Sequence, residues 1–163
     1  MTVYIVDIEA VDTRYTKQWK QYLPVQLTDH LPNTNVVVIS GGETPQATTP
    51  GAFLNFGGTN VYKSNQLKTI GEMFCNGEVK DGDYFLYTDA WNPTVIQLKY
   101  MAELLAVKIR IGGLWHAGSY DPQDFLGRLV GDKPWVRHAE KSMFFTYDDN
   151  YFATEFHAKM FAE

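Results

Sequence analysis

The residues best suited to chemistry in this chain gather in two short segments. The first is Asp89-Ala90-Trp91-Asn92-Pro93, where a carboxylate lies two residues from an indole. The second covers residues 112–122 and places His116, Ser119, Tyr120 and Asp121 among glycines, which can adopt positive φ angles. A carboxylate can accept a proton from a hydroxyl group, and an imidazole can hydrogen-bond a substrate. We therefore take Asp89 and His116 as the catalytic candidates.

Each candidate also has a structural interpretation. Asp89 could hydrogen-bond the start of the following helix, and Asp121 precedes a proline, which is typical of a helix cap that can also contact a ligand. His116 lies among polar residues after a strand, which favours a functional role. Asp81-Gly82-Asp83 looks like the acidic pair that holds a metal in some sugar transferases. Because it precedes its strand, we expect a turn at the opposite edge of the sheet.

The elements that must position these residues follow an alternating pattern. Short apolar runs rich in β-branched and aromatic residues alternate with segments of helical periodicity, which predicts an α/β fold with a Rossmann-like parallel sheet and helices on both faces. Ligands of such sheets bind beyond the carboxyl ends of the strands, so Asp89 and His116 should share one edge. Gly41-Gly42 and Gly112-Gly113 are expected to stop two of the strands. The expected strands are Val3–Ile8, Asn35–Ser40, Tyr84–Tyr87, Val107–Ile111 and Tyr151–Ala153.

The expected helices carry their own start and stop signals. Pro24 should interrupt or kink the first helix, Gly77 should cap the second, and Cys75 should be a small buried residue on that second helix. A helix that begins at Thr154 would dock its apolar face on its own sheet or begin a second domain. The stretch 42–60 is expected to be a long loop with a short strand over 52–56. The other helices are expected over 15–30, 64–76 and 134–143, with two more opening at Asn92-Pro93 and Asp121-Pro122.

Length and composition predict one domain over residues 1–163. The chain is 45% hydrophobic, enough to bury a core, and its 15% aromatic residues suit either a core or a binding cleft. A net charge of −5 with scattered basic residues argues against a broad surface for nucleic-acid phosphates. A single cysteine, no leader pattern and no long apolar run predict a cytoplasmic protein without a membrane span.

Missing motifs argue against several enzyme classes. The loop at residues 9–15 contains no glycine, which excludes the dinucleotide fingerprint, and no phosphate-binding loop is present. A Gly-x-Ser-x-Gly elbow is also absent, although a small hydrolase using Asp or Ser stays open as an alternative. His138 and His157 lack partner ligands at metal spacing, so no metal is expected.

Four stretches of the chain resemble a known group of enzymes. These stretches are Val11–Trp19, Thr88–Pro93, His116–Pro122 and Tyr151–His157. They are similar to phage and bacterial glycosyltransferases of the two-domain GT-B class, which includes phage enzymes that glucosylate hydroxymethylated DNA bases. The resemblance implies that residues 1–163 are the N-terminal, acceptor-side half of a GT-B architecture. The donor-binding C-terminal domain, which this chain lacks, would come from a longer gene product or a second chain.

The resemblance also implies an activity. The chain would take part in metal-independent transfer of a sugar from a nucleotide sugar, for example UDP-glucose, to an acceptor hydroxyl on DNA or a glycan, in the host cytoplasm if it is phage-encoded. No cofactor beyond this co-substrate is implied. Asp89 would orient or deprotonate the acceptor hydroxyl, and His116 would touch the donor sugar. The residues that would line the cleft are Glu9, Arg14, Trp91, Ser119, Tyr120 and Asp121.

A second interpretation comes from a different class of protein. It is a non-catalytic α/β binding or assembly module that recognises a partner or a small ligand. This interpretation accounts for the missing second domain without a longer chain.

Overall fold

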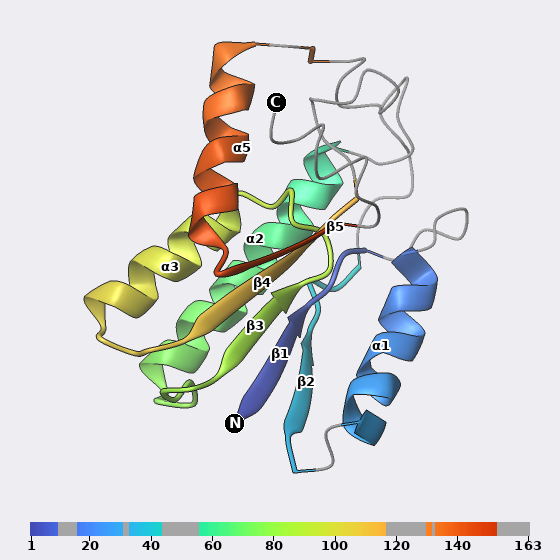
Figure 1. Ribbon diagram of the computed structural model, residues 1–163, viewed down its shortest axis with the longest axis vertical. Helices are drawn as coiled ribbons and strands as arrows, with labels where there is room; N and C mark the ends of the chain where they lie inside the picture. The colour runs from blue at the N-terminus through green and yellow to red at the C-terminus, as the bar shows by residue number, and fades with distance from the viewer. Residues whose placement is uncertain (10–15, 31–32, 44–55, 117–129, 132, 153–163) are drawn as a thin grey trace.

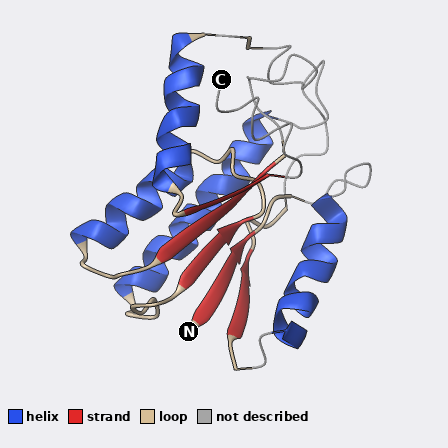
Figure 2. Ribbon diagram, in the orientation of Figure 1, coloured by secondary structure: helices blue, strands red, loops and turns tan. Residues whose placement is uncertain are grey.

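The structure, a computed structural model, describes residues 1–9, 16–30, 33–43, 56–116, 130–131 and 133–152. In these residues one five-stranded sheet is flanked by four helices (Figure 1, Figure 2). The strands are β1 (Thr2–Val6), β2 (Asn35–Ile39), β3 (Tyr84–Tyr87), β4 (Arg110–Trp115) and β5 (Asp149–Phe152). The helices are α1 (Thr16–His30), α2 (Phe56–Cys75), α3 (Thr94–Leu104) and α5 (Pro134–Thr146).

All neighbouring strands of the sheet are parallel, in the order β2-β1-β3-β4-β5. Figure 1 shows α1 on one face of the sheet and α2, α3 and α5 on the other. The prediction of a Rossmann-like α/β fold with helices on both faces is therefore confirmed. The chain first adds β2 on one side of β1 and then returns to add β3 on the other side, so the winding direction reverses between β1 and β3.

The main core lies between the sheet and helices α2, α3 and α5. Alternate residues of neighbouring strands point into it, and Phe85, Tyr87 and Ile111 have no exposed surface. The Tyr4 ring stacks on Phe85 with 4.8 Å between ring centroids. From the helices, Ile70, Leu98 and Met143 complete this layer and are likewise fully buried. The apolar runs thus form strands because one face of each is sealed by helices.

The fourth strand corrects the sequence prediction. Gly112-Gly113 does not stop it: β4 begins at Arg110 and continues through both glycines to Trp115. A Cβ at Gly112 would overlap the Tyr84 hydroxyl, and one at Gly113 would lie 2.8 Å from the Tyr147 ring. Glycine is needed here because side chains from other elements cross the strand closely on both faces. The loop that carries His116 therefore begins four residues later than expected.

Helix α2 is longer than its periodicity suggested. It begins at Phe56 rather than near residue 64, so the last part of the expected loop 42–60 is helical. It ends as predicted: Gly77 has φ of 69° and its N–H donates to the Phe74 carbonyl, while the Glu78 N–H donates to that of Met73. Cys75 is exposed, so the prediction of a buried thiol is wrong.

Proline does not interrupt the first helix. Helix α1 is continuous from Thr16 to His30 with Pro24 inside it, and the Thr28 hydroxyl donates to the Pro24 carbonyl at 2.8 Å. The loop with its short strand over 44–55, the helix opening at Asp121-Pro122 and the helix beginning at Thr154 fall outside the described residues.

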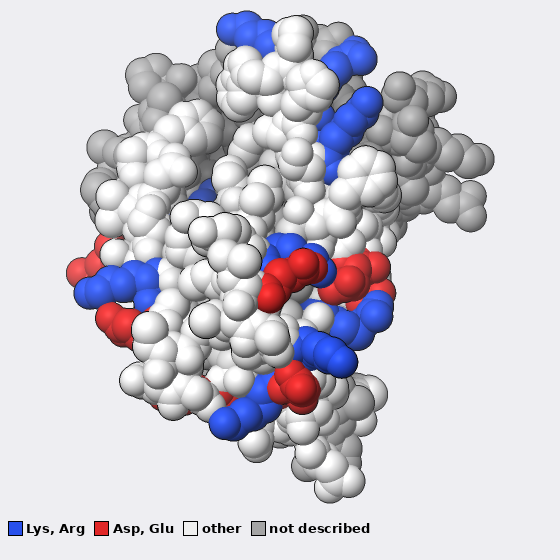
Figure 3. Space-filling view, turned by 90° about the vertical axis from the view of Figure 1, so that its left-hand side faces the viewer, with Lys and Arg blue, Asp and Glu red and all other residues white. Residues whose placement is uncertain are grey.

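Figure 3 shows the side of the molecule formed by α3 and α5, where most of the described surface is uncharged and acidic and basic side chains lie next to each other in the lower half of the view. One such pair is Lys99 with Glu103, 3.3 Å apart on α3. Three exposed basic residues recur every four positions at the start of α5 and along it: Lys133, which precedes the helix, Arg137 and Lys141. In the part of the chain that the structure describes, no helix combines the length and the apolar character needed to cross a bilayer.

Candidate functional site

The candidate site lies at the carboxyl edge of the sheet, which we define as residues 7–9 after β1, 88–92 after β3, and His116 after β4. The loops after β1 and β3 lead to helices on opposite faces of the sheet, because the winding direction reverses between these two strands (Figure 1). Such a reversal separates neighbouring loops and opens the crevice in which parallel α/β sheets bind ligands.

Thr88 is at the centre of this edge. Its N–H donates to the Val6 carbonyl at 3.1 Å, which extends the pairing of β3 with β1 by one residue. On the other side the His116 Nε2 lies 2.5 Å from the Thr88 carbonyl oxygen. Because a carbonyl can only accept, Nε2 carries the proton in this contact. His116 is thus held against the residue that precedes Asp89, and both His116 and Asp89 are half-buried.

Asp89 shapes the loop in which it lies. Its Oδ1 accepts a hydrogen bond of 3.1 Å from the Trp91 N–H, which closes a turn of the chain. The next turn is closed by Asn92, whose Oδ1 accepts from the Thr94 N–H at the start of α3. Asn92 thus bonds the first residue of α3, while Asp89 acts one step earlier, on the loop rather than on the helix.

Helix α5 and the segment after it also hold the loop that follows β3. The Trp91 indole N–H donates to Glu140 on α5 at 2.9 Å, and the Tyr147 hydroxyl donates to the Ala90 carbonyl at 2.7 Å. Burial raises the pKa of Tyr147 well above its ordinary value, so this hydroxyl remains a donor. The Trp91 indole is thereby turned toward α5 and packs against the core. With four anchors, the loop presents Asp89 in one orientation.

Asp7 is a member of this edge that the sequence analysis missed. Its side chain is buried, its Oδ1 accepts from the Tyr62 hydroxyl at 2.5 Å, and the Gln66 amide donates to the same oxygen at 3.1 Å. Gln66 also donates to the carbonyls of Asp7 and Ile39, at 2.7 and 2.8 Å, and so joins the ends of β1 and β2. Burial first, and then the hydrogen bond with Asp7, raise the pKa of Tyr62.

The spacing of Tyr62 and Gln66 was the available signal for this network. Residues four apart share one face of a helix, and this face also carries Ile70, which is fully buried. A polar pair on an apolar helix face implies buried hydrogen-bond partners. The aspartate inside the apolar run Val3–Ile8 would have been the first partner to test.

Four of the predicted site residues follow strands at the carboxyl edge, although the Trp91 indole points toward α5, and four are not described. Glu9 follows β1 at the carboxyl edge and is buried, and Asp89, Trp91 and His116 follow β3 and β4. The predicted sharing of one edge by Asp89 and His116 is therefore confirmed. Arg14, Ser119, Tyr120 and Asp121 lie outside the described residues.

The opposite, amino edge of the sheet holds the acidic pair that was expected to form a turn. Asp83 is buried, and its two carboxylate oxygens accept from the N–H groups of Thr2 and Lys80 at 2.9 and 2.8 Å. Asp81 accepts from the Lys108 N–H at 2.8 Å. The prediction of a structural turn is confirmed, because these carboxylates bind the backbone of their own chain. No group of three or more His, Cys, Asp or Glu among the described residues is placed to hold a metal ion.

The fold and this edge define a Rossmann-like parallel α/β protein with polar side chains at the reversal point of its sheet. Comparison with known proteins gives no match to any family model, any curated protein or any solved structure.

Proposed function

We propose that this chain is the acceptor-side half of a metal-independent glycosyltransferase of the GT-B class, with its reacting groups at the carboxyl edge. The observation that carries the proposal is the contact of His116 with the carbonyl of Thr88, the residue before Asp89, at the ends of the neighbouring strands β3 and β4. Both side chains are half-buried, so they combine fixed positions with access to a ligand. A basic group and a hydrogen-bond donor at one edge suit the activation of a hydroxyl next to a sugar.

In the proposed reaction, Asp89 accepts the proton of the acceptor hydroxyl. The acceptor oxygen forms a bond to the anomeric carbon of the donor sugar, the bond from that carbon to the diphosphate oxygen breaks, and the electron pair leaves with the nucleoside diphosphate. His116 would contact the donor sugar through Nδ1 or the ring carbons, since Nε2 donates to Thr88. Most contacts to the nucleotide would come from the second domain, supplied by a longer gene product or a second chain.

The acceptor that we favour is a hydroxyl on a modified DNA base or a glycan. The net charge of −5 does not support a broad phosphate-binding surface on this half. The exposed basic row of Lys133, Arg137 and Lys141, at the start of α5 and along it, offers at most a few phosphate contacts. Most of the basic surface for a DNA acceptor would therefore belong to the second domain.

The test is a transfer assay of the complete gene product with a panel of nucleotide sugars and with hydroxymethylated DNA or glycan acceptors. Asp89→Asn is the sharpest variant, because an amide oxygen can still accept from the Trp91 N–H but cannot serve as a base. We expect kcat to fall about 100-fold or more in this variant and in His116→Ala. Asp81→Asn at the amino edge is the matched control and should retain full activity. Normal turnover in both carboxyl-edge variants would refute the assignment.

A non-catalytic binding module is the second candidate, and one observation favours it. Asp89 and His116 both have backbone partners, which stabilise the loop without any reaction. The same variants distinguish the two functions: in a binding module, Asp89→Asn would preserve ligand affinity, and no nucleotide sugar would be consumed by the unmodified protein.

A further inference from the structure

The outer face of α3 is apolar although it is exposed. Ile96, Tyr100 and Leu104 recur every four residues, a spacing that places them on one face of the helix. Their exposed fractions are 40%, 65% and 69%, and we call these three residues the α3 stripe. The stripe belongs to the side of the molecule in Figure 3, where most of the described surface is uncharged. A row of exposed apolar side chains of this kind is typical of a contact surface.

One flank of the α3 stripe carries an ion pair. The Lys99 Nζ lies 3.3 Å from the Glu103 Oε1, and Glu103 is exposed while Lys99 is half-buried. With 3.6 residues per helical turn, both residues lie on the same side of Tyr100. The other flank is formed by the uncharged Gln97 and Met101. The outer face of α3 therefore has an apolar centre and one flank that carries both signs of charge.

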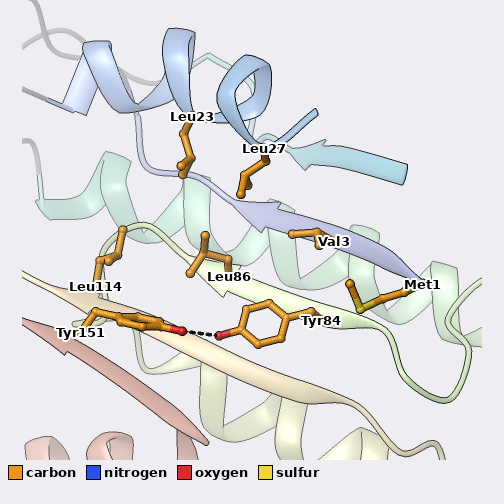
Figure 4. A pocket seen from close by; sticks show the side chains of 8 residues that line it. All are labelled: Met1, Val3, Leu23, Leu27, Tyr84, Leu86, Leu114 and Tyr151. Atoms are coloured by element: carbon orange, nitrogen blue, oxygen red, sulfur yellow. Dashed lines mark hydrogen bonds between the residues drawn. The ribbon is translucent and has the colours of Figure 1, made fainter. Parts of the chain in front are cut away.

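A second apolar surface lies on the opposite face of the sheet. It is a cavity of about 370 Å³ between α1 and the strands. Figure 4 shows its lining, which includes Leu23 and Leu27 of α1 and Leu86 and Leu114 of the sheet. A two-fold contact pairs a surface patch with the same patch of a second copy. Two paired hollows would leave a void, whereas protein contacts are close-packed, so the α3 stripe suits such a contact and the cavity does not.

We propose that two copies of this chain associate through the α3 stripe, with their α3 helices antiparallel about a two-fold axis. Tyr100 is the midpoint of the stripe, so the axis passes beside it and each Tyr100 packs on its own copy. The same rotation places Ile96 opposite Leu104 of the second copy at both ends of the contact. The apolar side chains that a single chain leaves exposed would thereby be buried against each other. This association is independent of the proposed transfer reaction.

The ion pair on the flank is the reason to assign a second copy of this chain and an antiparallel contact. At a rise of 1.5 Å per residue, Lys99 lies about 1.5 Å before the axis and Glu103 of the second copy about 4.5 Å before it. Opposite charges from the two copies therefore lie at nearly the same level. In a parallel contact, Lys99 would face Lys99 and Glu103 would face Glu103. The charges thus complement a second copy in one direction only.

Sedimentation velocity of the full chain over about 1–500 μM is the first test. One helix per copy is a small contact, so we expect a dissociation constant on the order of 10–100 μM and a mass that rises from 18.6 kDa toward twice that value. Tyr100→Asp places two carboxylates at the axis and should weaken association at least about tenfold. Val61→Asp, at an apolar residue of α2 that is 54% exposed, is the matched control and should not change it.

Charge variants of the flank give a second measurement in the same assay. Lys99→Glu or Glu103→Lys leaves only one sign of charge on the flank and should weaken association by about three- to tenfold. The combined swap, Lys99→Glu with Glu103→Lys, should restore it, because opposite charges again lie at the same level. A role of the ion pair within one helix alone would change neither value.

Disulfide formation between copies tests the direction of the contact. In a Cys75→Ser background, which removes the single native thiol, Ile96→Cys protein is mixed with Leu104→Cys protein and oxidised mildly. A disulfide needs Cα atoms within about 7 Å, so the two variants should link to each other. Neither should link to itself, because equivalent residues would lie about 12 Å apart along the helices. Lys68→Cys on the outer face of α2 is the control for random collision.

The outcomes either support the two-fold contact or overturn it. A rising mass that Tyr100→Asp or the single charge variants reduce, with links only between the two different cysteine variants, supports it. Self-linking of Ile96→Cys would show a parallel contact, and a mass rising beyond the dimer would show head-to-tail contacts. Either result would overturn the proposal. A mass of 18.6 kDa at every concentration would leave the α3 stripe to a different partner and would overturn it too.

Discussion

Buried carboxylates occur at both edges of the sheet, but they have different partners. At the amino edge, the buried Asp83 accepts hydrogen bonds from the backbone N–H groups of Thr2 and Lys80, and its exposed neighbour Asp81 accepts from that of Lys108. At the carboxyl edge, the buried carboxylate of Asp7 instead accepts from two side chains, the Tyr62 hydroxyl and the Gln66 amide. The comparison teaches that an acidic pair in a sequence becomes informative only when the direction of its strand is known.

The largest expected effect is a loss of stability on substitution of Asp83 at the amino edge. Asp83→Ala removes a buried carboxylate and two hydrogen bonds to backbone N–H groups, which should lower the free energy of unfolding by about 3 kcal/mol. Asp81→Ala removes one exposed hydrogen bond and should cost about 1 kcal/mol or less. Urea denaturation measures both. If the two variants were equally stable, the assignment of Asp83 as a structural residue would be wrong.

A smaller loss of stability is expected from a substitution in the core that also displaces the loop at the carboxyl edge. In Gly113→Ala the added Cβ would press on the Tyr147 ring and on Ala90, whose carbonyl accepts from Tyr147. We expect a loss of about 2 kcal/mol in unfolding free energy and changed amide chemical shifts at Ala90 and Trp91. Gly71→Ala, where nothing lies within 4 Å of the added carbon, should instead stabilise α2 by up to about 1 kcal/mol. Equal melting temperatures for the two variants would contradict this account of β4.

The smallest expected effect at neutral pH concerns the network around Asp7. Tyr62→Phe removes the donor to Asp7 Oδ1 and should cost about 1 kcal/mol, because the Gln66 amide still donates to the same oxygen. Ser40→Ala removes the part-buried contact of 3.2 Å to the Tyr62 hydroxyl and the exposed bond of 3.4 Å from the Gly42 N–H, and should cost less. Thermal denaturation ranks the pair. A greater loss in Ser40→Ala would show that the Tyr62–Asp7 bond contributes little.

Three buried tyrosines, among them Tyr62 of this network, should make the stability of the protein depend on alkaline pH. Burial raises the pKa values of Tyr62, Tyr87 and Tyr147, so the folded protein retains three protons that the unfolded chain releases above about pH 10. Their contribution to stability is therefore complete below pH 10 and is lost as the pH rises toward the folded-state values. Tyr62→Phe should make the fall in melting temperature between pH 10 and pH 11 less steep. An unchanged slope would mean that Tyr62 titrates normally in the folded protein.

Most of the sheet could be predicted from the sequence because a buried strand is recognisable from its own run of apolar residues. Tyr84–Tyr87 and Val36–Ile39 are uninterrupted apolar runs, and the two strands that contain them were placed within one residue of their observed ends. The fourth strand was misplaced because its glycines also resemble a strand stop. Their actual cause is the close approach of Tyr84 and Tyr147, which are distant in the sequence and which no local pattern contains.

For the candidate site, the sequence predicted the edge of the sheet but not the side-chain contacts there. The rule that ligands bind beyond strand ends placed Asp89 and His116 at one edge without knowledge of the strand order. The contact that joins their loops, from His116 to the Thr88 carbonyl, depends on side-chain geometry across 28 residues. The network of Asp7 with Tyr62 spans 55 residues and was missed for the same reason.

The central claim is that the carboxyl edge, and not the amino edge, binds the substrates. The most direct measurement is a map of backbone amide chemical shifts during titration with UDP-glucose, with a hydroxymethylated DNA oligonucleotide, and with both together. We predict shift changes at Thr88, Asp89 and His116 and none at Asp81 or Asp83. Changes confined to the amino edge, or none at either edge with all ligands present at millimolar concentration, would contradict the account.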